Sequence, residues 1–404
     1  MGARTIRKWL LSPIRNIKGI NDRLDCVESL MKDPLFLDRI REILRGFYDL
    51  ERIAARISLG SASPRDLIAL RDSLDNLHSL SRALEEKELP DAFSLPSDLS
   101  FEVLDEIKSF VKKSIVDDPP AIIRDGGVIR KGFNKELDEL RDVIQNTRSW
   151  LSEFEIKERE RTGIPKLRVG YNKIIGYYIE ITKPYIDRVP SDYIRKQTQL
   201  KTERYITPEL KEREAMALNA EEKIKSLENE LYIGILERLS EYTDGIRKLS
   251  RWVGELDTYQ SMAYVSRLYG YTRPIITDED VIDIKGGRHP VVERMVETFV
   301  PNDIRLDDKE RVAIVTGPNM AGKSTILRQI ALITLMAHMG CFVPAERATI
   351  GLTDRIFTRV GARDDITRGQ STFMMEMVET ANILNNATER SLVILDEIGR
   401  GTST

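Results

Sequence analysis

Cysteine is scarce in this 404-residue chain: only Cys26 and Cys341 are present, and they lie far apart in the sequence. Two distant cysteines provide neither a disulfide framework nor a spaced set of metal ligands, so we expect both to be small buried side chains in a reduced compartment. No stretch reaches the roughly 18 apolar residues of a membrane-spanning helix. The apolar part of MGARTIRKWLLSPI is too short for a signal peptide. These absences predict a cytoplasmic protein without membrane contact.

A strong net charge is missing as well. The formal net charge is -3, while 41% of the residues are hydrophobic and 31% are charged. No global field draws such a chain to nucleic acid, so any basic surface would have to be local. The length and the apolar content predict two to four soluble domains, each with its own core.

The first part of the chain has a helical pattern. Apolar residues recur at helical spacing through residues 21–88. Within residues 63–84 the start of a helix is clear, because Ser63 can cap it, Pro64 suits its first turn and Asp66 suits its positive end. We therefore predict an all-helical body.

Two long, highly charged helical stretches follow, at residues 134–162 and about 208–269. Such charge runs are ordinarily solvated helix faces. Because the two stretches flank a short non-helical insert, we predict an arm that runs out, carries a small tip and returns.

The predicted tip differs in composition from both helices. Residues 167–182 are rich in β-branched and aromatic residues around a glycine-containing turn, which favours a hairpin. Residues 166–205 contain nine Lys or Arg against four Asp or Glu, with six tyrosines among them. One interpretation is a tip that binds phosphates through these cations, with sequence-independent affinity from counterion release. The other is a small solvated β cap whose tyrosines form its core.

After about residue 273, short β-branched runs alternate with helical stretches, which predicts a mainly parallel α/β domain. Residues 311–316 (RVAIVT) are predicted to form a strand of this domain. An apolar-periodic helix is expected soon afterwards, from about residue 323.

A glycine-rich motif of the form G-x-x-x-x-G-K-S connects this strand to the helix, as Gly317, Gly322, Lys323 and Ser324. The glycines allow backbone N–H groups to close around phosphate oxygens, and the helix N-terminus adds its positive dipole end. Lys323 would reach the β- and γ-phosphates, and the Ser324 hydroxyl would ligate Mg²⁺. The motif in this setting predicts a site for ATP and Mg²⁺.

The last residues, LVILDEIGRGTST, place two acids directly after an apolar strand. Asp396 would hold the Mg²⁺ shell, and Glu397 would orient or deprotonate the attacking water. Together with the glycine-rich loop, this pair predicts an ATPase site.

Between these motifs, Ser371 and Thr372 precede another helical run. The simplest structural interpretation is a helix cap followed by core residues Phe373, Met374 and Met377.

Many separate segments resemble the MutS family of DNA mismatch repair ATPases. The segments similar to its ATPase motifs are TGPNMAGKSTILRQ, DRIFTRVGA, GQSTFMMEM with ETANIL, and LDEIGRGTST. The segments similar to its lever and clamp are ASPRDLIALR, GGVIRKGFNKELDELR, GYYIEITK and RYITPELKERE. GRHPVVE matches the start of its ATPase domain. The similarity covers essentially the whole chain.

The resemblance implies a multidomain fold. An all-α lever and core would carry an inserted small β-rich clamp, followed by an incomplete α/β P-loop ATPase domain of the ABC type. The implied division is 1–159 for the first part of the helical core and lever, 160–215 for the clamp, 216–272 for the return helix and 273–404 for the C-terminally truncated ATPase domain.

The resemblance also implies roles for individual residues. The nucleotide would be bound by Gly317, Pro318, Asn319, Met320, Ala321, Gly322, Lys323, Ser324, Thr325, Asp396 and Phe299, the last of which packs on adenine or is an ordinary core aromatic. Glu397, Lys323 and Asn319 would be catalytic, and Ser324 and Asp396 would hold Mg²⁺. Gly369, Ser371 and Thr372, in one motif with Glu376, would approach the partner subunit's γ-phosphate. DNA would contact Asn172, Lys173, Arg195, Lys196, Lys201 and Arg204.

Some residues depart from the family pattern. Gln199, Leu200, Lys201 and Thr202 stand where the family commonly has Leu-x-Asn-Ala, which leaves open the residue that meets DNA there. Ala321 replaces a common glycine and still permits close backbone approach. The chain begins at a motif that the family has internally, so we expect the mismatch-reading domain and the connector to be missing. It stops at Thr404, so we also expect the last ATPase strands and the dimerisation helices to be missing.

The implied function is DNA mismatch repair. The parent protein would use ATP, ADP and Mg²⁺, bind double-stranded DNA with mispairs or small loops, form a homodimer through its ATPase domains and recruit a MutL-type partner at the nucleoid. One alternative is a MutS homologue without a mismatch domain that acts on recombination or branched DNA. Another is a DNA-backbone-binding module that does not hydrolyse ATP.

Overall fold

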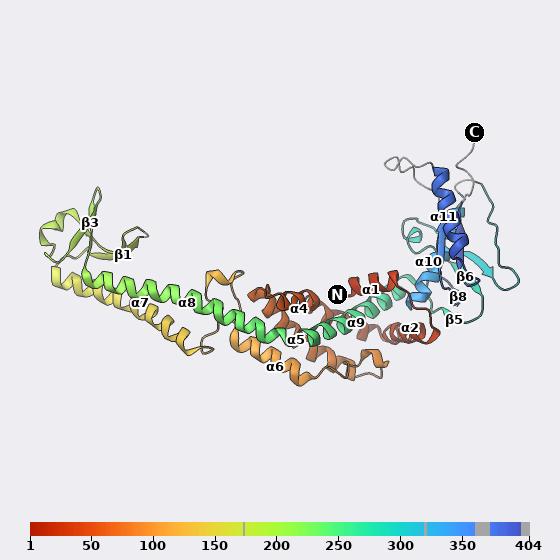
Figure 1. Ribbon diagram of the computed structural model, residues 1–404, viewed down its shortest axis with the longest axis horizontal. Coiled ribbons are helices and arrows are strands. Elements are labelled where there is room, and N and C mark those ends of the chain that lie inside the picture. Colours follow the sequence, from red (N-terminus) through yellow and green to blue (C-terminus); the bar gives the residue numbers. More distant parts are fainter. Residues whose placement is uncertain (173, 319–320, 360–371, 397–404) are drawn as a thin grey trace. The chain divides into compact units, whose positions relative to one another are not determined.

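The computed structural model describes residues 1–172, 174–318, 321–359 and 372–396 (Figure 1). The chain divides into two compact units. The first unit contains Met1–Glu51, Asp75–Ser100 and Gly245–Thr404, and the second contains Arg52–Leu74 and Phe101–Asp244. The prediction of several domains agrees with this division, whereas the four boundaries given above stay predictions.

Helices form the N-terminal part of the first unit. They are α1 (Gly2–Leu11), α2 (Ile17–Met31) and α3 (Pro34–Arg45), with the short η1 (Asp91–Phe93), and α9 (Thr243–Tyr269) belongs to this unit from Gly245 onward. Leu24, Val27 and Leu256 are among their buried residues. The all-helical character predicted for residues 21–88 is confirmed.

Helices α4 (Leu50–Ser58) and α5 (Pro64–Glu85) have residues in both units. The start of α5 agrees with the prediction from its cap. The Asp66 N–H donates to Ser63 Oγ at 3.2 Å, and the Ser63 N–H donates to Asp66 Oδ2 at 2.8 Å. These reciprocal bonds satisfy two backbone donors at the helix start.

The second unit contains α6 (Phe101–Ser114), η2 (Ile123–Asp125) and the two arm helices α7 (Lys135–Thr162) and α8 (Pro208–Ser240). The arm helices lie side by side (Figure 1). Asn134 caps α7 by accepting from the Leu137 N–H at 2.9 Å. Buried Glu228 on α8 pairs with Arg141 on α7 and also accepts from the Gly127 N–H. The predicted outgoing and returning arm is confirmed.

A four-stranded antiparallel sheet lies between the arm helices in sequence. Its strands are β1 (Arg168–Asn172), β2 (Gly176–Thr182), β3 (Ile194–Thr198) and β4 (Thr202–Ile206), in the order β1-β2-β4-β3, and η3 (Lys183–Arg188) follows β2. The predicted hairpin is confirmed as β1 and β2. Tyr193 and Tyr205 belong to the core under this sheet, together with Phe154, Ile179 and Leu210. Part of the tyrosine set therefore has the structural role that the second interpretation gives it.

The C-terminal part of the first unit contains two sheets. The larger consists of β5 (Ile275–Thr277), β6 (Ile282–Gly287), β7 (Asn302–Leu306) and β8 (Arg347–Gly351), in the order β5-β8-β6-β7, with η4 (Val292–Arg294) before β7. The smaller consists of β9 (Ile356–Arg359) and β10 (Leu392–Leu395). Helices α10 (Lys323–Met339) and α11 (Thr372–Asn386) complete this part.

The prediction of a mainly parallel sheet is wrong for the larger sheet. Only β5 and β8 are parallel there, whereas β6 is antiparallel to both β7 and β8. The β9–β10 pair is parallel. Alternation with helices, on which the prediction rested, does not determine the direction of each strand, because hairpin connections within a sheet also produce antiparallel pairs.

The strand predicted at residues 311–316 is also not observed. This segment has no regular structure, and the side chains of Val312 and Ile314 are 81% and 85% exposed. A β-branched run becomes a strand only when a neighbouring strand satisfies its backbone N–H and C=O groups. Among the residues that the structure describes, no strand pairs with this segment.

Both cysteines are free and buried, as the sequence predicts. Burial raises the pKa of the Cys26 thiol to about 12. Within the described ranges, no helix is long and apolar enough to span a membrane.

Candidate nucleotide site and nucleic-acid interface

The glycine-rich loop joins the irregular segment to α10. Gly317 has φ +157° and Gly322 has φ +90°, and positive values of this kind favour glycine. Thr325 and Ile326 each donate an N–H to the Gly322 carbonyl at 3.0 Å. The earlier N–H groups of Lys323 and Ser324 therefore point out of the helix start, where its positive dipole end also lies. Such a helix start fits an anionic phosphate group.

Lys323 places a cation at this loop. Its ammonium group donates to the carbonyl oxygens of Gly317 at 2.7 Å and Pro318 at 3.2 Å. Both acceptors belong to the glycine-rich loop, so the ammonium group lies against that loop. Ser324 and Thr325 follow in the first turn of α10, half-buried.

Asp396 directly follows β10 and is only 8% exposed. Its N–H donates to the Arg359 carbonyl at 2.7 Å, which continues the pairing of β10 with β9 beyond the last strand residue. The Arg359 side chain forms an ion pair with Glu379 of α11 at 3.1 Å. The acid is thus held at the end of a strand, but the prediction that the strand is buried holds for one face only, because Leu392 and Ile394 are buried whereas Val393 and Leu395 are exposed.

Several predicted site residues lie outside the described residues. They are Lys173, Asn319, Met320, Gly369, Ser371 and Glu397, and the side chains of Thr372, Phe373 and Glu376 also fall outside. Phe299 is half-buried in the irregular chain between η4 and β7.

The helix predicted after Ser371 is confirmed as α11. However, Met374 is 58% exposed and Met377 is 40% exposed, so the interpretation of these two residues as core is wrong. Val378 and Leu384 of the same helix are exposed as well. Apolar side chains gathered on one exposed helix are typical of an interaction surface.

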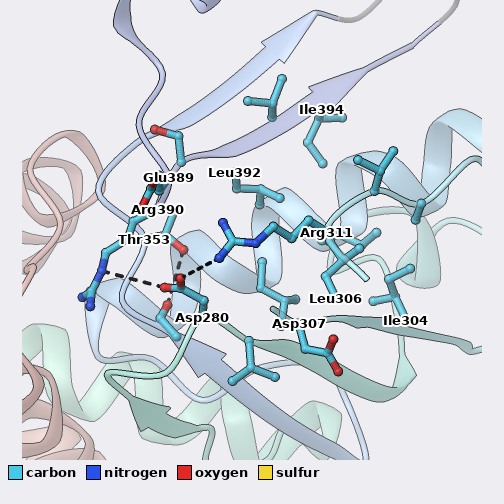
Figure 2. Close-up of a pocket in the computed structure, with 18 of the residues that line it drawn as sticks. Asp280, Ile304, Leu306, Asp307, Arg311, Thr353, Glu389, Arg390, Leu392 and Ile394 are labelled. Carbon is cyan, nitrogen blue, oxygen red and sulfur yellow. Dashed lines mark hydrogen bonds and ion pairs between the residues drawn. The ribbon is translucent and has the colours of Figure 1, made fainter. Parts of the chain in front are cut away.

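A cavity of about 520 Å³ lies between β6, β7, α10 and β10. Its walls combine apolar side chains, including Ile282, Ile304 and Leu392, with charged ones, and Val312 and Val315 of the irregular segment border it. At its edge, Arg311 and Arg390 reach Asp280 from opposite sides (Figure 2). This cavity is not predicted by the sequence, because the β-branched pattern of residues 311–316 indicates a strand within the sheet.

The basic side chains of the arm sheet differ in availability. Lys196 and Lys201 are exposed, and Arg195 is 64% exposed with Glu203 as a distant partner at 3.5 Å. Lys201 lies in the β3–β4 turn, which the Gln199 N–H closes by donating to the Thr202 carbonyl at 2.8 Å. Lys196 and Lys201 are thus accessible to a phosphate backbone, whereas Arg195 is exposed but paired with Glu203.

Two predicted DNA contacts have structural partners instead. Arg204 is only 14% exposed, donates to Gln197 at 3.0 Å and Glu180 at 3.3 Å, and lies over the Tyr178 ring at 4.3 Å. Arg204 therefore makes cross-strand contacts within the sheet, and its DNA contact stays a prediction. The Asn172 side chain accepts from the Ile174 N–H at 2.8 Å and so shapes the β1–β2 turn.

The fold and these sites define a multidomain protein. It contains a helical body, a long two-helix arm with a small sheet, and a glycine-rich loop at a helix N-terminus. This chain belongs to the MutS family: the family model described as MutS domain III matches residues 1–263, and MutS domain V matches residues 313–404.

Similar proteins described as DNA mismatch repair protein MutS occur in several organisms. The protein from Halothermothrix orenii is 52% identical over 406 residues, covering 100% of this chain and 45% of the relative. Those from Acetivibrio thermocellus and a Thermotoga species are 49% and 48% identical, again over 100% of this chain, and 47% and 50% of the relatives are covered. The chain spans about half the length of the curated relatives that it matches.

Proposed function

We propose that this chain is the lever, clamp and nucleotide-binding part of a DNA mismatch repair ATPase. The observation that carries the proposal is the loop from Gly317 to Ser324, which presents N–H groups and the Lys323 ammonium at the start of α10. Membership of the MutS family supports both the repair process and the ABC-type P-loop assignment.

In the proposed site, Lys323 and the N–H groups at the start of α10 bind the β- and γ-phosphates of ATP. Ser324 and Asp396 hold Mg²⁺, which when bound supplies positive charge against the charge that develops on the phosphate. Glu397 acts as the base for water and Asn319 positions that water. Phe299 packs on adenine.

The proposed site is completed by a second copy of the chain. Gly369, Ser371 and Thr372 of the partner subunit would approach the γ-phosphate. The exposed apolar side chains of α11, which follows this segment directly, support a contact surface there. A MutL-type partner, mispaired DNA and a cytoplasmic, nucleoid-associated location complete the proposal.

Binding of a fluorescent ATP analogue with Mg²⁺ tests the phosphate site. Lys323→Ala removes the cation of the loop, so we expect at least tenfold weaker binding. Lys309→Ala, which changes an exposed lysine outside the loop, serves as the matched control and should bind within about twofold of the unchanged chain. Equal affinities of all three proteins would contradict the assignment of the loop.

Duplex DNA binding at increasing salt tests the clamp assignment. Lys196→Ala and Lys201→Ala should each weaken binding and lower the slope of log affinity against log salt by about one, because each removes one phosphate contact. Mispaired and fully paired duplexes should bind alike. Lys18→Ala, an exposed lysine of α2, is the control; affinity independent of salt would exclude phosphate contacts.

A DNA-binding module without hydrolysis is the second candidate function. The irregular conformation of residues 311–316 favours it, because a phosphate loop without a strand before it is held less firmly for catalysis.

A further inference from the structure

The end of α10 opposite the glycine-rich loop is held by the helical body of the first unit. Arg23 of α2 donates from Nη1 to the carbonyl oxygen of Met339, the last residue of α10, at 3.0 Å. The Ile14 N–H, between α1 and α2, donates to the His338 carbonyl at 3.1 Å. Carbonyl groups at a helix C-terminus carry partial negative charge, so an arginine is a favourable partner there.

Arg23 also stacks on an aromatic side chain of the helical body. Its guanidinium carbon lies 3.4 Å from the centroid of the Trp9 ring in α1. Trp9 is 6% exposed and packs against Tyr259 of α9, with ring centroids 5.4 Å apart. Arg23 therefore joins the end of α10 to side chains from three helices.

The close approach of α10 to Arg23 depends on a glycine. Gly340 follows α10 with φ +79°, and a Cβ atom at this position would lie 2.4 Å from the Arg23 Cβ. Little room is left for α10 to move without moving the Arg23 side chain. Interiors packed in this way transmit displacements instead of absorbing them.

Helix α10 is a direct mechanical link between its two ends. It has 17 residues, which corresponds to a length of about 25 Å. Lys323 and Ser324 lie in its first turn, and Met339 is its last residue. A phosphate that draws the first turn toward itself therefore also shifts the carbonyl group that Arg23 binds.

We propose that Arg23 is a positioning residue that couples occupancy of the glycine-rich loop to the helical body, an inference that rests on the proposed function. A shift of Met339 changes the Arg23 hydrogen bond and moves the guanidinium on Trp9, which alters the packing of α1 against α9. Only Glu241 and Tyr242 separate α9 from the arm helix α8. A displacement caused by nucleotide binding is thereby transmitted along the chain to the proposed DNA-binding arm.

The coupling is measured as a ratio of two DNA dissociation constants, without and with a non-hydrolysable ATP analogue and Mg²⁺. The unchanged 404-residue chain should show a ratio of at least fivefold in either direction. Arg23→Met keeps much of the apolar stem and removes the charged fork, so its ratio should fall below twofold. Its affinities for the analogue alone and for DNA alone should stay within about twofold of the original.

Arg41→Met is the matched control. Arg41 of α3 lies over the ring of Tyr264 in α9 in a similar way, 3.5 Å from its centroid, but among the residues that the structure describes it does not donate to α10. This variant should keep the full ratio. If Arg41→Met lowers the ratio as much as Arg23→Met does, the effect belongs to loosened helix packing and the proposal is overturned.

Arg23→Lys covers the case in which Arg23→Met fails to fold. Lysine keeps the charge but cannot stack a planar group on Trp9 while it donates to Met339, so its ratio should also fall. A full ratio in a folded Arg23 variant overturns the coupling role and leaves the proposed function standing. Absence of analogue binding in the unchanged chain overturns both.

Discussion

At the scale of the residue, side chains of the same charge have different roles on the arm sheet. Arg204 and Lys196 occupy neighbouring strands of one basic segment, yet Arg204 is engaged by Glu180 and Gln197 whereas Lys196 is exposed. Basic composition alone predicts a phosphate-binding surface and treats the two residues alike. The cross-strand register pairs Arg204 with Glu180, and this contact separates the structural cation from the available one.

His338 makes the free energy of unfolding depend on pH, which is again an effect of a single residue. Its Nδ1 and the Thr334 carbonyl are 2.8 Å apart, and its Nε2 accepts from the Thr353 N–H at 2.9 Å, which requires a neutral ring. Burial lowers the pKa of His338, and burial lowers that of His289 as well. The unfolded chain therefore takes up protons below about pH 6.5 that the folded chain does not.

We therefore expect these histidines to make their full contribution to the free energy of unfolding above about pH 6.5. That contribution should be lost as the pH drops through the lowered pKa of the folded state. One proton contributes at most about 1.4 kcal/mol per pH unit. Urea unfolding at several values between pH 8 and pH 5 measures this slope. His338→Gln retains an acceptor without a titrating group and should have a shallower slope; an unchanged slope would assign the effect to other groups.

At the scale of the element, the ends of α7 and α8 follow rules that can be applied to the sequence. Asn134 and Thr207 accept from backbone N–H groups three residues later, and Gly163 ends α7 in the left-handed conformation with φ +64°. The interactions that define these ends span only a few residues. Short-range patterns were therefore sufficient to predict the arm.

Replacing either of two arm glycines by alanine should change the free energy of unfolding, in opposite directions for the two positions. At Gly163 a side chain is strained by the positive φ, so Gly163→Ala should lower the free energy of unfolding by about 1 kcal/mol. At Gly234, inside α8, a Cβ atom meets nothing within 4 Å, so Gly234→Ala should raise it by about 1 kcal/mol. Denaturant unfolding measures both; changes of the same sign would contradict the assigned conformations.

The segment 311–316 shows the limit of prediction at this scale. Its β-branched residues favour a strand, but Val312 and Ile314 are exposed and the segment borders a cavity. Strand formation depends on a partner that is distant in sequence, and no property of the segment itself supplies that partner.

At the scale of the whole molecule, we predict slow ATP hydrolysis by these 404 residues. The glycine-rich loop follows an irregular exposed segment, so its N–H groups and Lys323 are not firmly preorganised. We expect a turnover at least tenfold below about 1 per second, the low end of typical enzyme rates. Phosphate release measures it, with Lys323→Ala as the background; a rate above 1 per second that this variant abolishes would show that the segment does not limit catalysis.

The sequence by itself determined the helix caps, the arm with its hairpin and the glycine-rich loop, because each depends on residues that are close along the chain. Only the tertiary structure decided that Arg204 is engaged, that Met374 and Met377 are exposed, that the larger sheet is mixed and that Arg23 meets the end of α10. Arg23 and Met339 are 316 residues apart in sequence. Contacts of this kind arise from packing between distant segments, for which a local pattern carries no signal.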